Sequence, residues 1–97
     1  VLIPAHDEEA ALPRTLDSVF AATFPSTRLR ILVVADNCTD GTATVARRFG
    51  ADCVERTDPA NRGKGHAVAF GLKHALAGPT DAVLILDADC TLDDELL

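Results

Sequence analysis

Two aspartates, Asp87 and Asp89, follow directly on the apolar run of residues 82–86. Alternate side chains of a strand point to the same side, so a continued strand would turn both carboxylates the same way. Neighbouring carboxylates repel unless a cation lies between them, and their oxygens suit Mg²⁺ or Mn²⁺, which keep positions for water and substrate phosphates. The pair therefore predicts a divalent metal site that takes a diphosphate. The alternative is that both residues cap a following helix, whose first turn would also hold the acidic residues 93–95.

A basic loop precedes this pair, with the sequence Arg62-Gly63-Lys64-Gly65. Its glycines let the backbone approach a ligand, and Arg62, Lys64 and the start of the next helix supply positive potential. The spacing is neither that of a nucleotide-binding P-loop nor that of a G-x-G-x-x-G dinucleotide fingerprint. The loop is therefore a candidate anion site, with a solvated turn as the alternative.

Two further loops carry candidate ligand residues. Asp36 ends the apolar segment 31–35 and could accept hydrogen bonds from a nucleotide base or sugar, or else stabilise its own turn. Asp40 is predicted to be structural, as a cap of the next helix. In the first loop His6 is followed by the three acids 7–9, which either contribute to a site or favour the first turn of a helix.

The cysteines bear on the setting of the protein and on one alternative metal site. There are three, with no C-x-x-C pair, which argues against a disulfide framework or a zinc ribbon and indicates a reducing, cytoplasmic setting. His6, Cys38 and Cys90 nevertheless fall at the same edge of the predicted sheet. An imidazole with two thiolates would suit zinc, and this set stays open as an alternative.

Charge and hydropathy exclude several classes of partner. Nine basic and fifteen acidic residues give a net charge of -6, which argues against nucleic acid or an anionic lipid surface. No apolar run reaches the roughly 18 residues that span a bilayer. The chain begins inside a predicted strand and stops after an acidic turn, so we expect a part of a longer protein, either cytoplasmic or the cytoplasmic domain of a membrane-associated parent.

The elements that must position these loops follow an alternating pattern. Apolar segments rich in β-branched residues alternate with segments of helical spacing, which is typical of a parallel sheet with right-handed crossovers. The predicted fold class is α/β, a Rossmann-like, mostly parallel sheet with helices on both faces that forms part of a domain. Ligands of such sheets bind beyond the carboxyl ends of the strands, where all four polar loops lie. The predicted strands are residues 1–4, 31–35, 53–55 and 82–86.

Each predicted helix has an apolar stripe that should face the sheet. Phe70 lies off the third stripe and is expected to face a part of the protein outside this chain. The stripes are Leu12, Leu16, Val19 and Phe20; Thr42, Val45, Ala46 and Phe49; and Val68, Leu72, Ala75 and Leu76.

The four loops, taken in order, resemble those of the family-2 glycosyltransferases of the GT-A fold. VLIPAHDEE is similar to the family's opening strand and Pro-x-aromatic-Asn-Glu loop, with Pro4 and Glu8 agreeing and His6 in the aromatic position. VVADNCTDGT is similar to Val-Asp-Asp-Gly-Ser-Thr-Asp-Gly-Thr, with Ala35 for the first Asp and Asp36 keeping the second. NRGKGHA resembles the Asn-x-Gly-Lys-Gly segment near the donor, and DAD resembles the metal-binding Asp-x-Asp.

The resemblance implies that residues 1–97 are the nucleotide-sugar-binding half of a GT-A domain. The enzyme would transfer a sugar with inversion from a nucleoside diphosphate sugar, most often a UDP-sugar, to an acceptor hydroxyl, with Mg²⁺ or Mn²⁺. Asp36 would contact the base, Asp89 the metal, and the general base would lie beyond Leu97 in the acceptor-binding half. The donor-binding residues implied are Pro4, His6, Glu8, Asp36, Arg62, Lys64 and Asp87, and the metal ligands are Asp89 and Asp87.

Three other functions remain as alternatives. LILDADCTL also resembles the Asp-x-Asp-x-Thr strand of haloacid-dehalogenase-like phosphatases, in which Asp87 would be the nucleophile and Asp89 the general acid/base. That motif usually stands on the first strand, whereas here it follows the fourth. A nucleotidyltransferase would share the fold but normally has a Gly-rich, Arg-containing loop after the first strand, and AHDEE has neither residue. A non-catalytic nucleotide-binding module is the third alternative.

Overall fold

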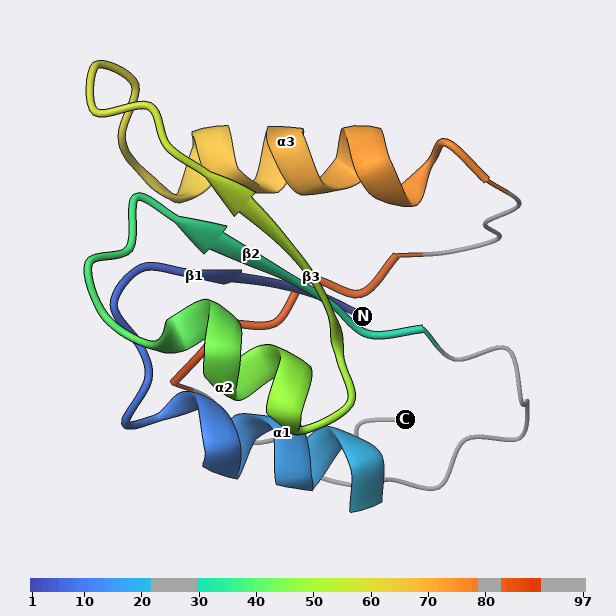
Figure 1. Cartoon of the computed structure of the whole chain (residues 1–97). Coiled ribbons are helices and arrows are strands. Elements are labelled where there is room, and N and C mark those ends of the chain that lie inside the picture. Colours follow the sequence, from blue (N-terminus) through green and yellow to red (C-terminus); the bar gives the residue numbers. More distant parts are fainter. Residues whose placement is uncertain (22–29, 79–82, 90–97) are drawn as a thin grey trace.

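The computed structural model describes residues 1–21, 30–78 and 83–89, in which strands and helices alternate (Figure 1). The order of elements confirms the predicted β/α alternation, and the weak third strand is longer than the segment 53–55 predicted for it. Cys90 and the acidic residues 93–95 lie outside the described residues. The elements are β1 Leu2–Ala5, α1 Leu12–Ala21, β2 Leu32–Asp36, α2 Thr42–Arg48, β3 Asp52–Arg56 and α3 Lys64–Ala75.

The sheet is parallel, with β2 between β1 and β3. Leu2 pairs with Leu32 and Leu32 with Asp52, so the strands start level and their carboxyl ends meet at one edge. Figure 1 shows α3 on one face and α1 with α2 on the other. These observations confirm a Rossmann-like α/β fold with helices on both faces. Among the described residues, none of the helices has the length and apolar character needed to cross a membrane.

The structure corrects the prediction of a fourth strand. Of its described part, residues 83–86, only Ile85 forms a bridge, parallel to Leu2 on the outer edge of β1. Leu2 N donates to Leu84 O at 2.7 Å and Leu86 N to Leu2 O at 3.0 Å. Leu84 and Ile85 are each 42% exposed, so the segment lacks the burial on both faces that its apolar run predicts.

Two apolar clusters fill the space between the sheet and its helices. The strands place alternate side chains on opposite faces, so Ile3 and Val33 pack with α1 while Leu2 and Val34 pack with α3. On α3 the buried positions are the small residues Ala67 and Gly71. A Cβ at Gly71 would lie 2.5 Å from Leu2 Cδ1 and 2.7 Å from Val34 Cγ2. Glycine therefore allows α3 to approach the sheet closely and fixes the position of the helix that begins at Lys64.

The predicted stripes need three corrections. Phe20 is 49% exposed, and the buried face of α1 instead includes Thr15, which shares the i, i+3, i+4, i+7 spacing of its apolar neighbours. Leu76 is 59% exposed because it follows the last residue of α3. Phe70, expected to face outward, packs against the cluster on the α3 face and makes an edge-to-face contact with His74 at 4.6 Å between centroids.

Candidate functional site

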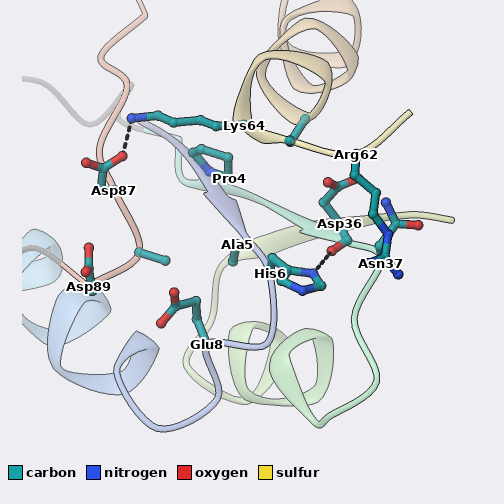
Figure 2. A pocket seen from close by; sticks show the side chains of 13 residues that line it. Pro4, Ala5, His6, Glu8, Asp36, Asn37, Arg62, Lys64, Asp87 and Asp89 are labelled. Carbon is teal, nitrogen blue, oxygen red and sulfur yellow. Dashed lines mark hydrogen bonds and ion pairs between the residues drawn. The ribbon is translucent and has the colours of Figure 1, made fainter. Parts of the chain in front are cut away.

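A cavity of about 360 Å³ lies at the carboxyl ends of the strands (Figure 2). Every residue predicted for the site lines it. The structure therefore brings together side chains from four loops. The lining consists of Pro4, His6, Glu8, Asp36, Arg62, Lys64, Asp87 and Asp89, together with Ala5, Asn37, Gly63, Ala67 and Ala88.

The loop after β1 is hydrogen-bonded along its length to the loop after β2. His6 Nδ1 lies 2.9 Å from the carbonyl oxygen of Asp36, and Glu8 N donates to Thr42 Oγ1 at 3.0 Å. Glu9 Oε2 accepts from Gly41 N at 2.9 Å, so Glu9 lies at the start of α2 in space. The hypothesis that Glu8 or Glu9 serves the first turn of the following helix is thus wrong, because α1 begins only at Leu12 and has no acidic residue in its first turn.

Asp40 has the structural role predicted for it. Its Oδ1 accepts from Thr42 N at 2.9 Å and its Oδ2 from Glu9 N at 3.2 Å. Burial opposes ionisation, but hydrogen bonds from Thr42 and Glu9 outweigh it and lower the pKa of Asp40 below its ordinary value. Asp40 therefore accepts, as a carboxylate, from the first N–H group of α2, whose N-cap residue is Gly41, and joins the two loops.

Asp36 is buried, and its carboxylate is paired with a residue that sequence reasoning missed. Arg56, at the end of β3, donates from Nη1 to Asp36 Oδ1 at 2.6 Å, and both side chains are nearly inaccessible. Arg56 Nη2 donates to the carbonyl oxygen of Asn61 at 2.8 Å. Arg56 is the neighbour of Asp36 across the ladder, so only the strand register could have revealed it. The pair orients Asp36 and leaves its other lone pairs for further donors.

Asn37 connects the loop after β2 to the loop after β3 and was also missed. It is buried, with a φ of 50°, a left-handed conformation that asparagine tolerates better than most residues. Its Nδ2 donates to Asp58 O at 3.2 Å, and its Oδ1 accepts from Asp58 N at 2.7 Å. A hydrogen bond from Asn61 and the nearby Arg56 lower the pKa of Asp58, against the effect of desolvation. Asn37 therefore fixes the start of the loop that leads to Arg62.

Lys64 and the two aspartates form the opposite side of the cavity. Gly63, the N-cap residue that precedes α3, has a φ of +117°, a conformation that other residues rarely adopt. Lys64 Nζ forms an ion pair with Asp87 Oδ1. Both side chains are about half exposed, so the pair is accessible to a ligand. Figure 2 shows Arg62 on the Asp36 side and Lys64 on the Asp87 side, so the basic loop supplies a cation to each.

Strand geometry does not continue through Asp87-Ala88-Asp89, contrary to the prediction. Ala88 and Asp89 form a turn, and Ala88 is buried although both aspartates are exposed. Thr15 Oγ1 donates to the carbonyl oxygen of Ala88 at 2.6 Å. The placement of the two carboxylates is therefore set by this turn and not by alternation along a strand.

The donor set of this turn fits a divalent cation. Asp87 and Asp89 both line the cavity and offer carboxylate oxygens, the ligands that Mg²⁺ and Mn²⁺ prefer. In this structure the cation that lies against Asp87 is the ammonium of Lys64. Two exposed carboxylates leave positions for water and substrate oxygens, which a catalytic cation needs.

The described residues do not test the zinc alternative as a whole. Cys90 lies outside them, and His6 is hydrogen-bonded to the carbonyl of Asp36. Burial raises the pKa of the Cys38 thiol above its ordinary value. Within the described residues, Cys38 lies instead beside Asp7 and Asp40, with ligand atoms within 4.8 Å of one another. Both carboxylates accept backbone hydrogen bonds from the neighbouring loop, which accounts for the cluster.

The fold and the cavity together define an α/β domain of Rossmann type with a ligand site of mixed charge at the carboxyl edge of its sheet. The sequence matches glycosyl transferase family 2 over residues 1–97. The chain belongs to this family. The phosphatase and nucleotidyltransferase alternatives are therefore wrong, and the four loops that suggested the family are the four that form the cavity.

One curated relative is similar to the chain in sequence, and two solved structures are similar to it in fold. The probable glycosyltransferase YdaM of Bacillus subtilis (strain 168) is 37% identical over 95 residues, which cover 94% of this chain and 22% of that protein. S. aureus TarS 1-349 in complex with UDP-GlcNAc has a TM-score of 0.79 and 23% identity, over 98% of this chain and 27% of that one. The mannosyltransferase PcManGT from Pyrobaculum calidifontis, in complex with GDP-Man and Mn²⁺, has a TM-score of 0.70 and 25% identity, over 91% and 26%. The chain spans about a quarter of the length of these proteins.

Proposed function

We propose that residues 1–97 are the nucleotide-sugar-binding half of a GT-A domain in an inverting glycosyltransferase. The donor is a nucleoside diphosphate sugar, with a UDP-sugar as the first candidate, and the acceptor group is a hydroxyl. The observation that carries the proposal is a single cavity in which a basic loop faces an acidic turn. Family membership and the nucleotide sugars bound to PcManGT and TarS support the same class of donor.

The nucleoside is proposed to bind on the Asp36 side. Asp36 is held by Arg56, so its carboxylate is oriented before a ligand arrives, and a base or ribose donor can use its remaining lone pairs. His6 is anchored by its Nδ1 at Asp36 and keeps more than half of its side chain exposed. Its ring can therefore present a face to the base, while Pro4 and Glu8 line the same cavity.

The diphosphate is proposed to bind between Arg62, Lys64 and the start of α3. Arginine and lysine side chains and the backbone N–H groups of a helix start all favour phosphate oxygens. In this structure Lys64 pairs with Asp87, and a phosphate oxygen would compete for the same ammonium. Asp87 is proposed to face the sugar or ribose once Lys64 contacts the diphosphate.

Asp89, with Asp87, is proposed to hold Mg²⁺ or Mn²⁺. A bound cation would offset the negative charge that develops on the nucleoside diphosphate as it leaves. The residue that deprotonates the acceptor is expected outside residues 1–97, in the acceptor-binding half. The cavity lining of this chain would bind and orient the donor, and the other half would complete the reaction.

The test is a calorimetric titration of the intact protein with UDP and with GDP, each with and without Mn²⁺. We expect saturable binding that is stronger with Mn²⁺, and a loss of at least tenfold in the metal-dependent part in Asp89→Asn. Asp17→Asn, at an exposed position of α1 outside the cavity, is the matched control and should bind as the wild type does. A folded protein that binds neither nucleotide would refute the proposal.

Two further measurements separate an enzyme from a binding module and test the stereochemistry. Incubation with the preferred UDP- or GDP-sugar should release nucleoside diphosphate, whereas a non-catalytic module would bind without turnover. The anomeric configuration of the first product, followed by NMR, should be opposite to that of the donor. Retention of configuration would contradict the inverting mechanism without affecting the assignment of the donor site.

A further inference from the structure

Thr15 is a fully buried polar residue on the core-facing side of α1, and the donor-binding scheme assigns it no role. Its hydroxyl donates to the carbonyl oxygen of Ala88 at 2.6 Å, a bond between residues 73 positions apart. The same hydroxyl lies 3.5 Å from the carbonyl of Ala11, the longer bond that helical threonines commonly form. The shorter contact is therefore the one that joins α1 to another part of the molecule.

Ala88 is the residue between the two aspartates of the acidic turn. It is buried in the cluster that also contains Leu12 and Leu16 of α1, while Asp87 and Asp89 on either side are exposed. The carbonyl that Thr15 holds belongs to the peptide joining Ala88 to Asp89. Fixing the plane of that peptide fixes where the Cα atom of Asp89 lies, and therefore the point from which its side chain starts.

The burial of the Ala88 carbonyl favours one orientation of this peptide. A buried carbonyl without a donor is costly, and burial strengthens the hydrogen bond that satisfies it. Upstream, the segment is tied to β1 by backbone bonds that end at Leu86, before the turn begins. Beyond Leu86, the hydroxyl of Thr15 supplies a buried anchor for this segment among the bonds that the structure describes.

We infer that Thr15 is a positioning residue for the cation site, because it orients the Asp87-Ala88-Asp89 turn from beneath. This inference rests on the proposed function, in which Asp89 and Asp87 hold a divalent cation. Thr15 itself does not reach the cation or the donor. It acts through the backbone of Ala88, and its contribution should appear in metal affinity and not in nucleotide binding on the Asp36 side.

The test compares Thr15→Val with Thr15→Ser in the intact protein. Valine keeps the shape and removes the hydroxyl, whereas serine keeps the hydroxyl and removes a methyl group. We expect Thr15→Val to weaken Mn²⁺ binding by about tenfold, as measured by the electron paramagnetic resonance signal of Mn²⁺ in the presence of UDP. Thr15→Ser should retain the affinity of the wild type. UDP binding without metal should be unchanged in both variants.

Ser18→Ala is the matched control, because Ser18 donates to the Thr15 carbonyl within the same helix at 2.7 Å and should leave Mn²⁺ affinity unchanged. If Thr15→Val fails to fold, the serine variant still decides: a loss of Mn²⁺ affinity with the hydroxyl present would overturn the inference. Equal Mn²⁺ affinity in the valine variant and the wild type would overturn it as well. If the wild type itself shows no Mn²⁺-dependent UDP binding, the proposed function has failed instead.

Discussion

The two sides of the cavity are built in different ways. On the Asp36 side, which we define as Asp36, Asn37, Arg56 and Asp58, a buried ion pair and paired side-chain-to-backbone bonds connect the ends of two strands, β2 and β3. On the Asp87 side, defined as Lys64, Asp87, Ala88 and Asp89, the charged groups are exposed. A buried hydrogen bond from Thr15 holds the carbonyl oxygen of Ala88. Figure 2 shows Asp36 and Asn37 on one side of the cavity and Asp87 and Asp89 on the other.

This difference suggests a division of labour between the two sides. Buried pairs hold their geometry because breaking them leaves an uncompensated charge, whereas exposed pairs are weak and exchange readily with solvent. The proposed nucleoside site is therefore preorganised, and the proposed cation and diphosphate site can exchange its lysine–aspartate pair for ligand contacts. Four predictions test this comparison.

Loss of Arg56 should have the largest effect. Arg56→Met leaves the buried carboxylate of Asp36 without its partner, so we expect the free energy of unfolding to fall by about 3–5 kcal/mol. Chemical denaturation of the intact protein measures it. Arg47→Met, which breaks an exposed pair with Glu55, should cost less than about 1 kcal/mol. Similar losses in the two variants would show that the Asp36 side is not held by its ion pair.

Gly71→Ala should have the next largest effect, since α3 carries Lys64 to the cavity. The added Cβ would meet Leu2 and Val34 at 2.5 and 2.7 Å, so the helix must move or the core must repack, at a cost of about 1–3 kcal/mol. Gly65→Ala in the same helix is the control, because its Cβ meets nothing within 4 Å. Denaturation curves that rank the two variants in the opposite order would disprove the close approach.

Asp40→Ala should cost about 1 kcal/mol near neutral pH, the size expected when the first N–H group of a helix loses its side-chain acceptor. Because hydrogen bonds from Thr42 and Glu9 lower the pKa of Asp40 below 3.8 in the folded protein, this stabilisation is complete above the unfolded pKa. It is lost as pH falls through the folded pKa. The difference in thermal stability between wild type and variant should therefore shrink in acid, whereas Thr44→Ala, at an exposed position of α2, should show a pH-independent difference. A difference that grows in acid would contradict the assignment.

Lys64→Gln should affect stability least. The Lys64–Asp87 pair is exposed, so its loss should change the free energy of unfolding by less than about 1 kcal/mol. UDP binding should nevertheless weaken roughly tenfold, because the variant loses about the free energy of one charge-assisted hydrogen bond. Calorimetry and denaturation on the same sample measure both. A variant as unstable as Arg56→Met would remove the distinction between the two sides.

The sequence predicted the order of elements and the composition of the cavity lining because both follow from local patterns. Apolar runs separated by helical spacing specify a parallel sheet, and a parallel sheet brings the residues after each strand to one edge. The sequence predicted less well which face of each helix is buried and where each helix ends. Phe20 and Leu76 match a helical period, but the position of α1 and the length of α3 left them exposed. The stripe predicted for the third helix passed over the small residues Ala67 and Gly71, which are the buried positions of α3.

By itself, the sequence determined the family, the fold class and the edge at which the polar loops meet, since each depends on residue types and their spacing along the chain. The tertiary structure alone decided which polar groups hold one another. Arg56 meets Asp36 across 20 residues and Thr15 meets Ala88 across 73. No local period encodes such pairs, because they depend on strand register and on how a helix packs against a turn.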